Sequence, residues 1–88
     1  MILWDDAKNL KLQLERKISF EEITAIILRK EYVDILENPS YPEQAIFVIR
    51  FNEYIWAVPF LVDQEGDIIL KTAYPSRKLQ KRYGASHE

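Results

Sequence analysis

The spacing of the apolar residues changes once along this chain, close to Glu31, and the change restricts the folds that the chain can adopt. Before that point apolar residues recur every three or four positions, as on one face of an α-helix. After it they alternate with polar residues or form short runs between turn residues, which is typical of β-strands. Helices grouped before strands predict an α+β domain, with two N-terminal helices packed on a sheet of three or four antiparallel strands. Because 88 residues bury one modest core, residues 1–88 are expected to form a single domain.

The two helices have different signals. Asp5 is a suitable N-cap for the first, and its buried stripe is predicted from four apolar residues spaced three or four apart, while Leu12 falls outside that stripe. The stripe residues are Ala7, Leu10, Leu14 and Ile18. The second helix opens at a capping box, in which the Ser19 hydroxyl and the Glu22 carboxylate each accept from the other residue's backbone amide. Its inward residues are Phe20, Ile23, Ile26 and Ile27.

Four segments after Glu31 are predicted strands, namely 32–36, 45–51, 54–62 and 68–74. Asn52 and Glu53 fit a tight two-residue hairpin between the second and third of them. Pro59 has no N–H to donate, so we expect an edge position or a bulge there. Residues 76–83 predict a short basic C-terminal helix with Ser76 as its N-cap, and residues 85–88 are expected to fray.

Composition excludes several kinds of chemistry. The chain has no cysteine, so it can form neither a disulfide scaffold nor a thiolate metal site, and this fits a cytoplasmic protein. Its one histidine, His87, is next to last, which argues against imidazole-bound zinc and Ser-His-Asp catalysis. No Gly-rich loop is present to hold a nucleotide, and no apolar run approaches the roughly 18 residues of a membrane helix. We therefore expect neither metal, cofactor nor membrane.

The formal net charge of −2 hides a strong asymmetry. Residues 1–70 carry seven Lys and Arg against thirteen Asp and Glu, whereas residues 71–88 carry five against one. The five cations lie within twelve residues: Lys71, Arg77, Lys78, Lys81 and Arg82. Such a concentration favours a local contact with an anion or a nucleic acid over a globally basic binder.

Aromatic and hydroxyl side chains are interleaved with these cations, at Tyr74, Ser76 and Tyr83. Cations can follow the phosphates of single-stranded RNA while a ring stacks on a base. If the contact is catalytic, the ribose 2′-hydroxyl can serve as nucleophile, which needs a base, an acid and a cation but no metal. The alternative is a solvated basic helix, or one that docks on an acidic partner.

Other residues carry weaker signals. Arg50 closes a predicted strand, where it either joins the same anionic site or forms a salt bridge at the rim. Tyr54, Trp56 and Phe60 are expected to belong to the core and the sheet surface rather than to a base-stacking platform.

Three motifs together resemble the BrnT-type toxin family. Residues 4–8 (WDDAK) are similar to the family's WDxxK start, and residues 19–22 (SFEE) follow at the same spacing as its vSFEEA helix entry. Residues 77–78 (RK) open a basic helix similar to the family's closing S-A-R-K-A-T-R-R-E-R run. The matches frame nearly the whole chain, and the first is the most distinctive.

The resemblance implies a RelE/ParE-like toxin, a metal-independent ribonuclease that a small DNA-binding antitoxin, often of the ribbon-helix-helix kind, holds inactive in the bacterial cytoplasm. It places Arg77 and Lys78 on the family's basic pair, and Lys71 where the family commonly has a basic residue. Pro75, not Ser76, takes the place of the family's serine. Residues 15–17 (ERK) replace a segment with a histidine, and Tyr83 replaces an acid of the closing helix.

Stabilisation of the pentacoordinate phosphate is therefore expected from Lys71 and Arg77, and proton transfer from Lys78 or Tyr83. Arg50, Tyr74, Ser76, Lys81 and Arg82 are the candidate RNA-binding residues. Two other functions stay open: a non-catalytic domain that binds a protein partner through the basic segment, and an RNA-binding domain whose affinity falls with salt.

Overall fold

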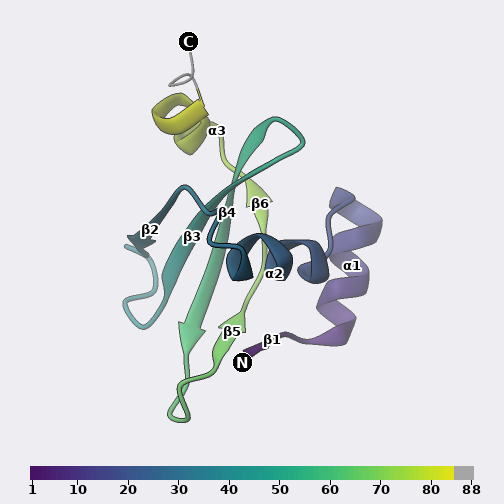
Figure 1. The fold of residues 1–88 in the computed structure, drawn as a ribbon, viewed down its shortest axis with the longest axis vertical. Helices are drawn as coiled ribbons and strands as arrows, with labels where there is room; N and C mark the ends of the chain where they lie inside the picture. The colour runs from purple at the N-terminus through teal and green to yellow at the C-terminus, as the bar shows by residue number, and fades with distance from the viewer. Residues whose placement is uncertain (85–88) are drawn as a thin grey trace.

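The computed structural model describes residues 1–84, in which two helices lie on one face of a mixed β-sheet (Figure 1). The elements, in chain order, are β1 (Ile2–Leu3), α1 (Asp6–Arg16), α2 (Phe20–Leu28), β2 (Asp34–Glu37), β3 (Ala45–Phe51), β4 (Tyr54–Val62), β5 (Ile68–Leu70), β6 (Tyr74–Pro75), α3 (Arg77–Leu79) and a π-helical turn, η1 (Gln80–Gly84). Residues 85–88, which include His87 and the predicted frayed end, lie outside the described part of the chain.

The sheet has the strand order β1-β5-β4-β3-β2, and β6 pairs with β4 beyond the end of β5. The α+β class is confirmed, but the prediction of a purely antiparallel sheet is wrong. The first residues of the chain form β1, which runs parallel to β5, so the sheet is mixed. A two-residue strand carries too little periodic signal to be recognised before its partner is known. Within residues 1–84, the helices are too short and too polar to span a lipid bilayer.

The predicted capping box of α2 is confirmed. The Ser19 hydroxyl accepts from the Glu22 amide at 3.1 Å, and the Glu22 carboxylate accepts from the Ser19 amide at 2.9 Å. All four of the residues predicted to point inward from this helix are buried. They pack against Phe47, Ile49, Val58 and other residues on the helical face of the sheet.

The predicted stripe of α1 is wrong for three of its four residues; Ile18, which follows the helix, is buried as predicted. Leu10 and Leu14 are 59 % and 69 % exposed, and Ala7 is exposed as well, while the helix buries Asn9 and Leu12 instead. The Asp5 N-cap is confirmed, because its carboxylate accepts from the Lys8 amide. The helix is thus rotated relative to the predicted stripe, so that a polar residue lies inside and two leucines lie outside.

The strands predicted at 45–51 and 54–62 are confirmed as β3 and β4, whereas the one predicted at 32–36 starts later, at Asp34. Pro59 lies in β4 at the centre of the sheet, not at its edge, with β3 on one side and β5 and β6 on the other. Its carbonyl accepts from the Lys71 amide at 2.9 Å, but it has no N–H to donate. The strand predicted at 68–74 is interrupted opposite this residue, and 71–73 separate β5 from β6.

The C-terminal helix begins at its predicted N-cap, Ser76, whose hydroxyl accepts from the Leu79 amide at 3.1 Å. After one α-helical turn it continues as η1, which contacts β4. The Gln80 side chain accepts from the Ile55 amide at 3.0 Å, and the Tyr83 hydroxyl reaches Asp34 of β2. The basic segment is therefore tied to the sheet at both β4 and β2.

The hairpin between β3 and β4 is the predicted two-residue turn, with Phe51 opposite Tyr54. Its central residues, Asn52 and Glu53, have φ values of 52° and 64°, a pair of left-handed conformations that suits Asn followed by Gly. Glu53 therefore occupies a position that favours glycine.

We expect Glu53→Gly to raise the free energy of unfolding by about 0.5–1 kcal/mol, because glycine adopts positive φ without the steric penalty of a side chain. Urea denaturation measures this change. Glu43→Gly is the matched control: its residue is exposed and is not among those with positive φ, so the same substitution there should be neutral or destabilising. Equal effects at the two positions would contradict the strain assigned to Glu53.

Candidate functional site

A groove of about 510 Å³, here called the α1 groove, runs between α1, the segment 71–74 and the loop before β3. Its lining includes four cations but a single carboxylate, Glu15. The cations are Lys8, Lys11, Arg16 and Lys71; the polar and aromatic lining residues are Asn38, Ser40, Tyr41, Gln44, Thr72 and Tyr74; the apolar ones are Leu12, Phe20 and Pro59. In a chain of net charge −2, this groove is a local concentration of positive charge.

Two features of the fold build the groove. Because Pro59 cannot donate to a partner strand, residues 71–73 leave the ladder, and this brings Lys71 and Thr72 to its lining. On the opposite side, an Arg16 guanidinium N–H donates to the carbonyl oxygen of Ala73, which joins the end of α1 to the interrupted strand. The groove is thus held by contacts between segments that are far apart in the sequence.

The structure separates the predicted catalytic residues. Lys71 and Tyr74 line the α1 groove, whereas Arg77 lines a second hollow of about 460 Å³, here called the hairpin pocket. The hairpin pocket is lined by Phe51, Asn52, Tyr54, Trp56, Pro75 and Arg77. Lys71 and Arg77 therefore belong to neighbouring sites on the two sides of β6 rather than to one cluster.

The remaining predicted residues line neither hollow. Lys78, Lys81 and Arg82 are exposed on α3 and η1, and the Arg82 guanidinium lies 5.1 Å from the centre of the Tyr83 ring. Arg50 is exposed on β3, and no ion pair found within residues 1–84 includes it. Ser76 serves as a helix cap.

Tyr83 is engaged with the sheet. Its hydroxyl donates to a carboxylate oxygen of Asp34 at 2.7 Å. This hydrogen bond raises the pKa of Tyr83 and lowers the pKa of Asp34, and an amide hydrogen bond from Ile35 lowers the latter further. A phenol with a raised pKa is a poor general base at neutral pH. The contact gives Tyr83 a structural role in holding η1 to β2.

We expect Tyr83→Phe to lower the melting temperature between pH 5 and 8, because the variant lacks the hydrogen bond to Asp34. Since the pKa of Asp34 is lowered on folding, the bond's contribution is present at neutral pH and is lost as pH falls through that lowered value, below about pH 4. Since the pKa of Tyr83 is raised, the contribution is also lost as pH rises through that value, above about pH 10. Thermal melts of both proteins across this range measure the difference.

The matched control for this experiment is Tyr41→Phe, which removes the same hydroxyl from an exposed tyrosine of the loop before β3. Its melting temperature should follow that of the parent protein at every pH. A constant difference between parent and Tyr83→Phe from pH 3 to 11 would contradict the assigned hydrogen bond.

Sequence reasoning missed three groove cations, Lys8, Lys11 and Arg16, to which it gave no role in the site. A signal was available, because residues three or four apart share a helix face, and Lys8, Lys11 and Glu15 follow that spacing next to Leu12. What was missing was the orientation of α1. With Leu12 rather than Leu10 inside, these cations lie beside the core, where they face the interrupted strand.

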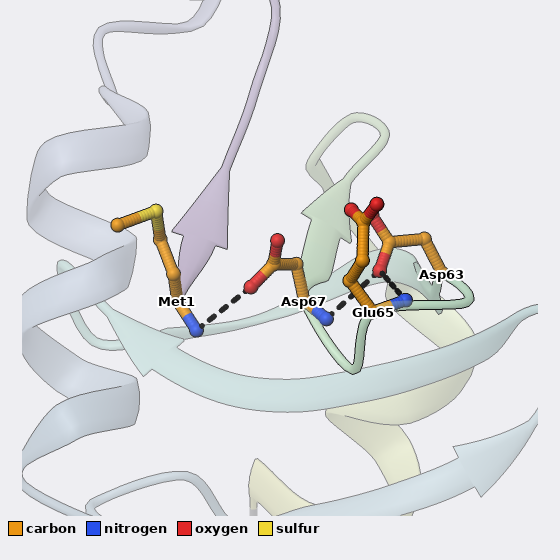
Figure 2. A network of polar contacts seen from close by, with 4 residues as sticks. All are labelled: Met1, Asp63, Glu65 and Asp67. Carbon is orange, nitrogen blue, oxygen red and sulfur yellow. Dashed lines mark hydrogen bonds and ion pairs between the residues drawn. The ribbon is translucent and has the colours of Figure 1, made fainter.

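Three carboxylates gather at the hairpin between β4 and β5 (Figure 2). Oxygens of Asp63, Glu65 and Asp67 lie within 4.8 Å of one another. This is the one cluster of potential metal ligands found among residues 1–84. Asp63 accepts from the amides of Glu65 and Asp67 at 3.0 and 2.9 Å, and the Met1 ammonium pairs with Asp67 at 3.2 Å. These contacts close the turn and partly balance its charge, which accounts for the acids without an ion.

Comparison of the chain with models of known protein families, with curated proteins and with solved structures found no match in any of the three.

Proposed function

We propose that this protein is the toxin of a type II toxin-antitoxin pair, of BrnT-like and RelE-like type, and that it acts on RNA in the bacterial cytoplasm as a metal-independent endoribonuclease. The observation that carries the proposal is the α1 groove, whose lining contains four cations and one carboxylate. RNA presents one negative charge per nucleotide, and cations that follow the backbone provide most of the affinity for a single strand.

The groove has the groups that cleavage through the ribose requires. In this reaction the 2′-oxygen attacks the neighbouring phosphorus, the bond to the 5′-oxygen breaks, and the products are a 2′,3′-cyclic phosphate and a 5′-hydroxyl. Lys71 and Arg16 stabilise the extra negative charge on the phosphorane oxygens. Glu15 accepts the proton of the 2′-hydroxyl, and Tyr74 supplies a proton to the departing 5′-oxygen.

The proposed partner is a small DNA-binding antitoxin, often of the ribbon-helix-helix kind. The outward face of α1 supports a protein contact, because Leu10 and Leu14 are largely exposed there and are separated by one helical turn. An antitoxin bound along this face would lie beside Lys11 and Glu15 and would restrict entry to the groove.

One observation favours a non-catalytic alternative, in which the same surface binds RNA or a protein without cleaving it. Tyr83, one of the two groups expected to transfer a proton, donates to Asp34 and lies outside the groove lining. The groove still binds an anionic chain without this group, so translation would be blocked by occupancy alone.

The proposal is tested by inducing the parent chain, Lys71→Ala and Arg77→Ala in a bacterial host, with growth and total RNA followed in parallel. We expect the parent to stop growth and degrade RNA, and Lys71→Ala to do neither. Arg29→Ala is the control, since it removes a cation that lines neither hollow. Arrest with intact RNA would favour the non-catalytic alternative, and normal growth with a folded parent protein would contradict the toxin assignment.

A further inference from the structure

The hairpin pocket combines aromatic walls with one charged group. Phe51, Tyr54 and Trp56 share one face of the β3–β4 hairpin, because Phe51 and Tyr54 are directly opposite and Trp56 is two residues further along β4. The Phe51 and Trp56 rings meet edge to face at 86°, with centroids 6.0 Å apart. The indole N–H is already used, since it donates to the Phe51 carbonyl at 3.2 Å. Arg77 is the one charged residue among the lining residues.

This end of the sheet lies beyond α2, because the tip of the hairpin extends past that helix (Figure 1). Trp56 is 7 % exposed, but Phe51 and Tyr54 are half-buried and take part in the core from its border. Tyr54, Trp56 and Phe60 were expected to belong to the core and the sheet surface. Trp56 and Phe60 are buried in the core, and Tyr54 packs against the core and also lines the pocket.

We propose that the hairpin pocket binds one nucleotide of the RNA strand, with its base against the Tyr54 and Phe51 rings and its phosphate on Arg77. The inference rests on the proposed function for the source of the nucleotide and adds a second site to it. A flat base suits an aromatic wall, and stacking of this kind accepts any base. A guanidinium suits phosphate because its N–H groups match the phosphate oxygens.

One further feature favours a nucleotide over a purely apolar ligand. Asn52, at the tip of the hairpin, adds an amide with both a donor and an acceptor, which is the combination that reads the edge of a base.

Two consecutive residues of β6 line the two hollows. Tyr74 lines the groove and Pro75 lines the pocket, and these are consecutive residues of one strand whose side chains point to opposite faces.

Tryptophan fluorescence tests the proposal directly, because Trp56 is one of two tryptophans in the chain. In a Trp4→Phe background the signal comes from Trp56 alone. This protein would be titrated with the four ribonucleoside monophosphates, with the matching nucleosides, and with inorganic phosphate. We expect saturable quenching by at least one monophosphate, weaker quenching by its nucleoside, and none by inorganic phosphate.

Variants assign the binding to the named groups. Tyr54→Leu, which keeps an apolar side chain but removes the ring, should weaken nucleotide binding by roughly 5- to 100-fold, whereas Tyr54→Phe should retain it. Arg77→Ala should reduce the affinity for the monophosphate to that for the nucleoside. Arg29→Ala, the control for the lost charge, should bind as the parent does. Circular dichroism confirms that each variant is folded.

Absence of saturable quenching in the folded protein, or equal binding by Tyr54→Leu and Tyr54→Phe, would overturn the proposal. The readout involves no cleavage and no toxicity, so its outcome is independent of the test of the proposed function. Nucleotide binding with normal growth would support the nucleotide site and contradict the toxin assignment. Growth arrest without nucleotide binding would support the toxin assignment and contradict the nucleotide site.

Discussion

The double variant Lys8→Gln/Lys11→Gln is expected to bind single-stranded RNA roughly 50-fold more weakly than the parent at 50 mM salt, and about tenfold more weakly at 200 mM. Both lysines line the α1 groove, and each phosphate contact on a single strand contributes about 0.7 to the slope of log K against log salt. Losing two contacts therefore reduces that slope by about 1.4. Glutamine keeps the length of the side chain and a similar helix propensity, so the helix itself is preserved.

Fluorescence anisotropy of a labelled oligoribonucleotide, measured at several salt concentrations, gives both the affinity and the slope. The matched control is Arg29→Gln/Lys30→Gln, which removes two cations at the end of α2 that line neither hollow. If the two double variants lose affinity equally, RNA binding follows the overall charge of the protein and the α1 groove is not its site.

Replacement of Asn9 by alanine is expected to lower the free energy of unfolding by about 2–3 kcal/mol, a large fraction of the stability of a domain of this size. Asn9 is 5 % exposed, and its side chain joins the two helices. Its carbonyl oxygen accepts from the Phe20 amide at 2.8 Å, and its amide nitrogen donates to the Glu21 carboxylate at 2.8 Å. In the variant the buried Phe20 N–H has no acceptor, which is the main cost.

Urea denaturation of Asn9→Ala and of Gln13→Ala, an exposed residue on the same helix, measures the effect against its control. Asn9→Asp provides a second variant with a distinct signature. It keeps an acceptor for Phe20 but places a carboxylate beside Glu21, whose pKa is held low chiefly by the Asn9 hydrogen bond. Repulsion between the two carboxylates raises the pKa of one of them, so this variant should gain stability relative to the parent as pH falls from 7 toward about 4. A pH-independent difference would contradict the assigned contact with Glu21.

Local signals in the sequence predicted the parts of the fold that depend on neighbouring residues. The capping box at Ser19 and Glu22 places the start of α2, and the alternating segments place β3 and β4 with their two-residue hairpin. Each of these elements depends on residues within about ten positions of one another, so its signal lies in the same stretch of sequence as the element.

The wrong predictions concern parts of the fold that depend on residues far away in the sequence. Two faces of α1 could point inward: one carries Leu10 and Leu14, and the other carries Leu12. Apolar spacing favours the face with Leu10 and Leu14. The structure takes the second because Asn9 is then able to bond to both Phe20 and Glu21. Patterns of hydrophobicity give a buried asparagine no weight. In the same way, Pro59 interrupts the strand opposite it at residues 71–73, and the sequence around those residues does not reveal the interruption.

The candidate site follows the same division. The sequence identifies a basic segment, but it treats Lys71 and Arg77 as one cluster because they are close along the chain. The structure places them in separate hollows and supplies three further cations to Lys71 from α1. These cations are some sixty residues away in the sequence, so no local pattern associates them with the site.

This long-range construction affects the order of events during synthesis of the chain. The lining of the α1 groove extends from Lys8 to Tyr74, Arg16 is joined to Ala73 across 57 positions, and β1 pairs with β5. A ribosome that has made the first half of the protein has produced α1, one side of the groove, but not the segment with Lys71, Thr72 and Tyr74 on the other side. Any activity that depends on the groove therefore starts only after residue 74 has left the exit tunnel.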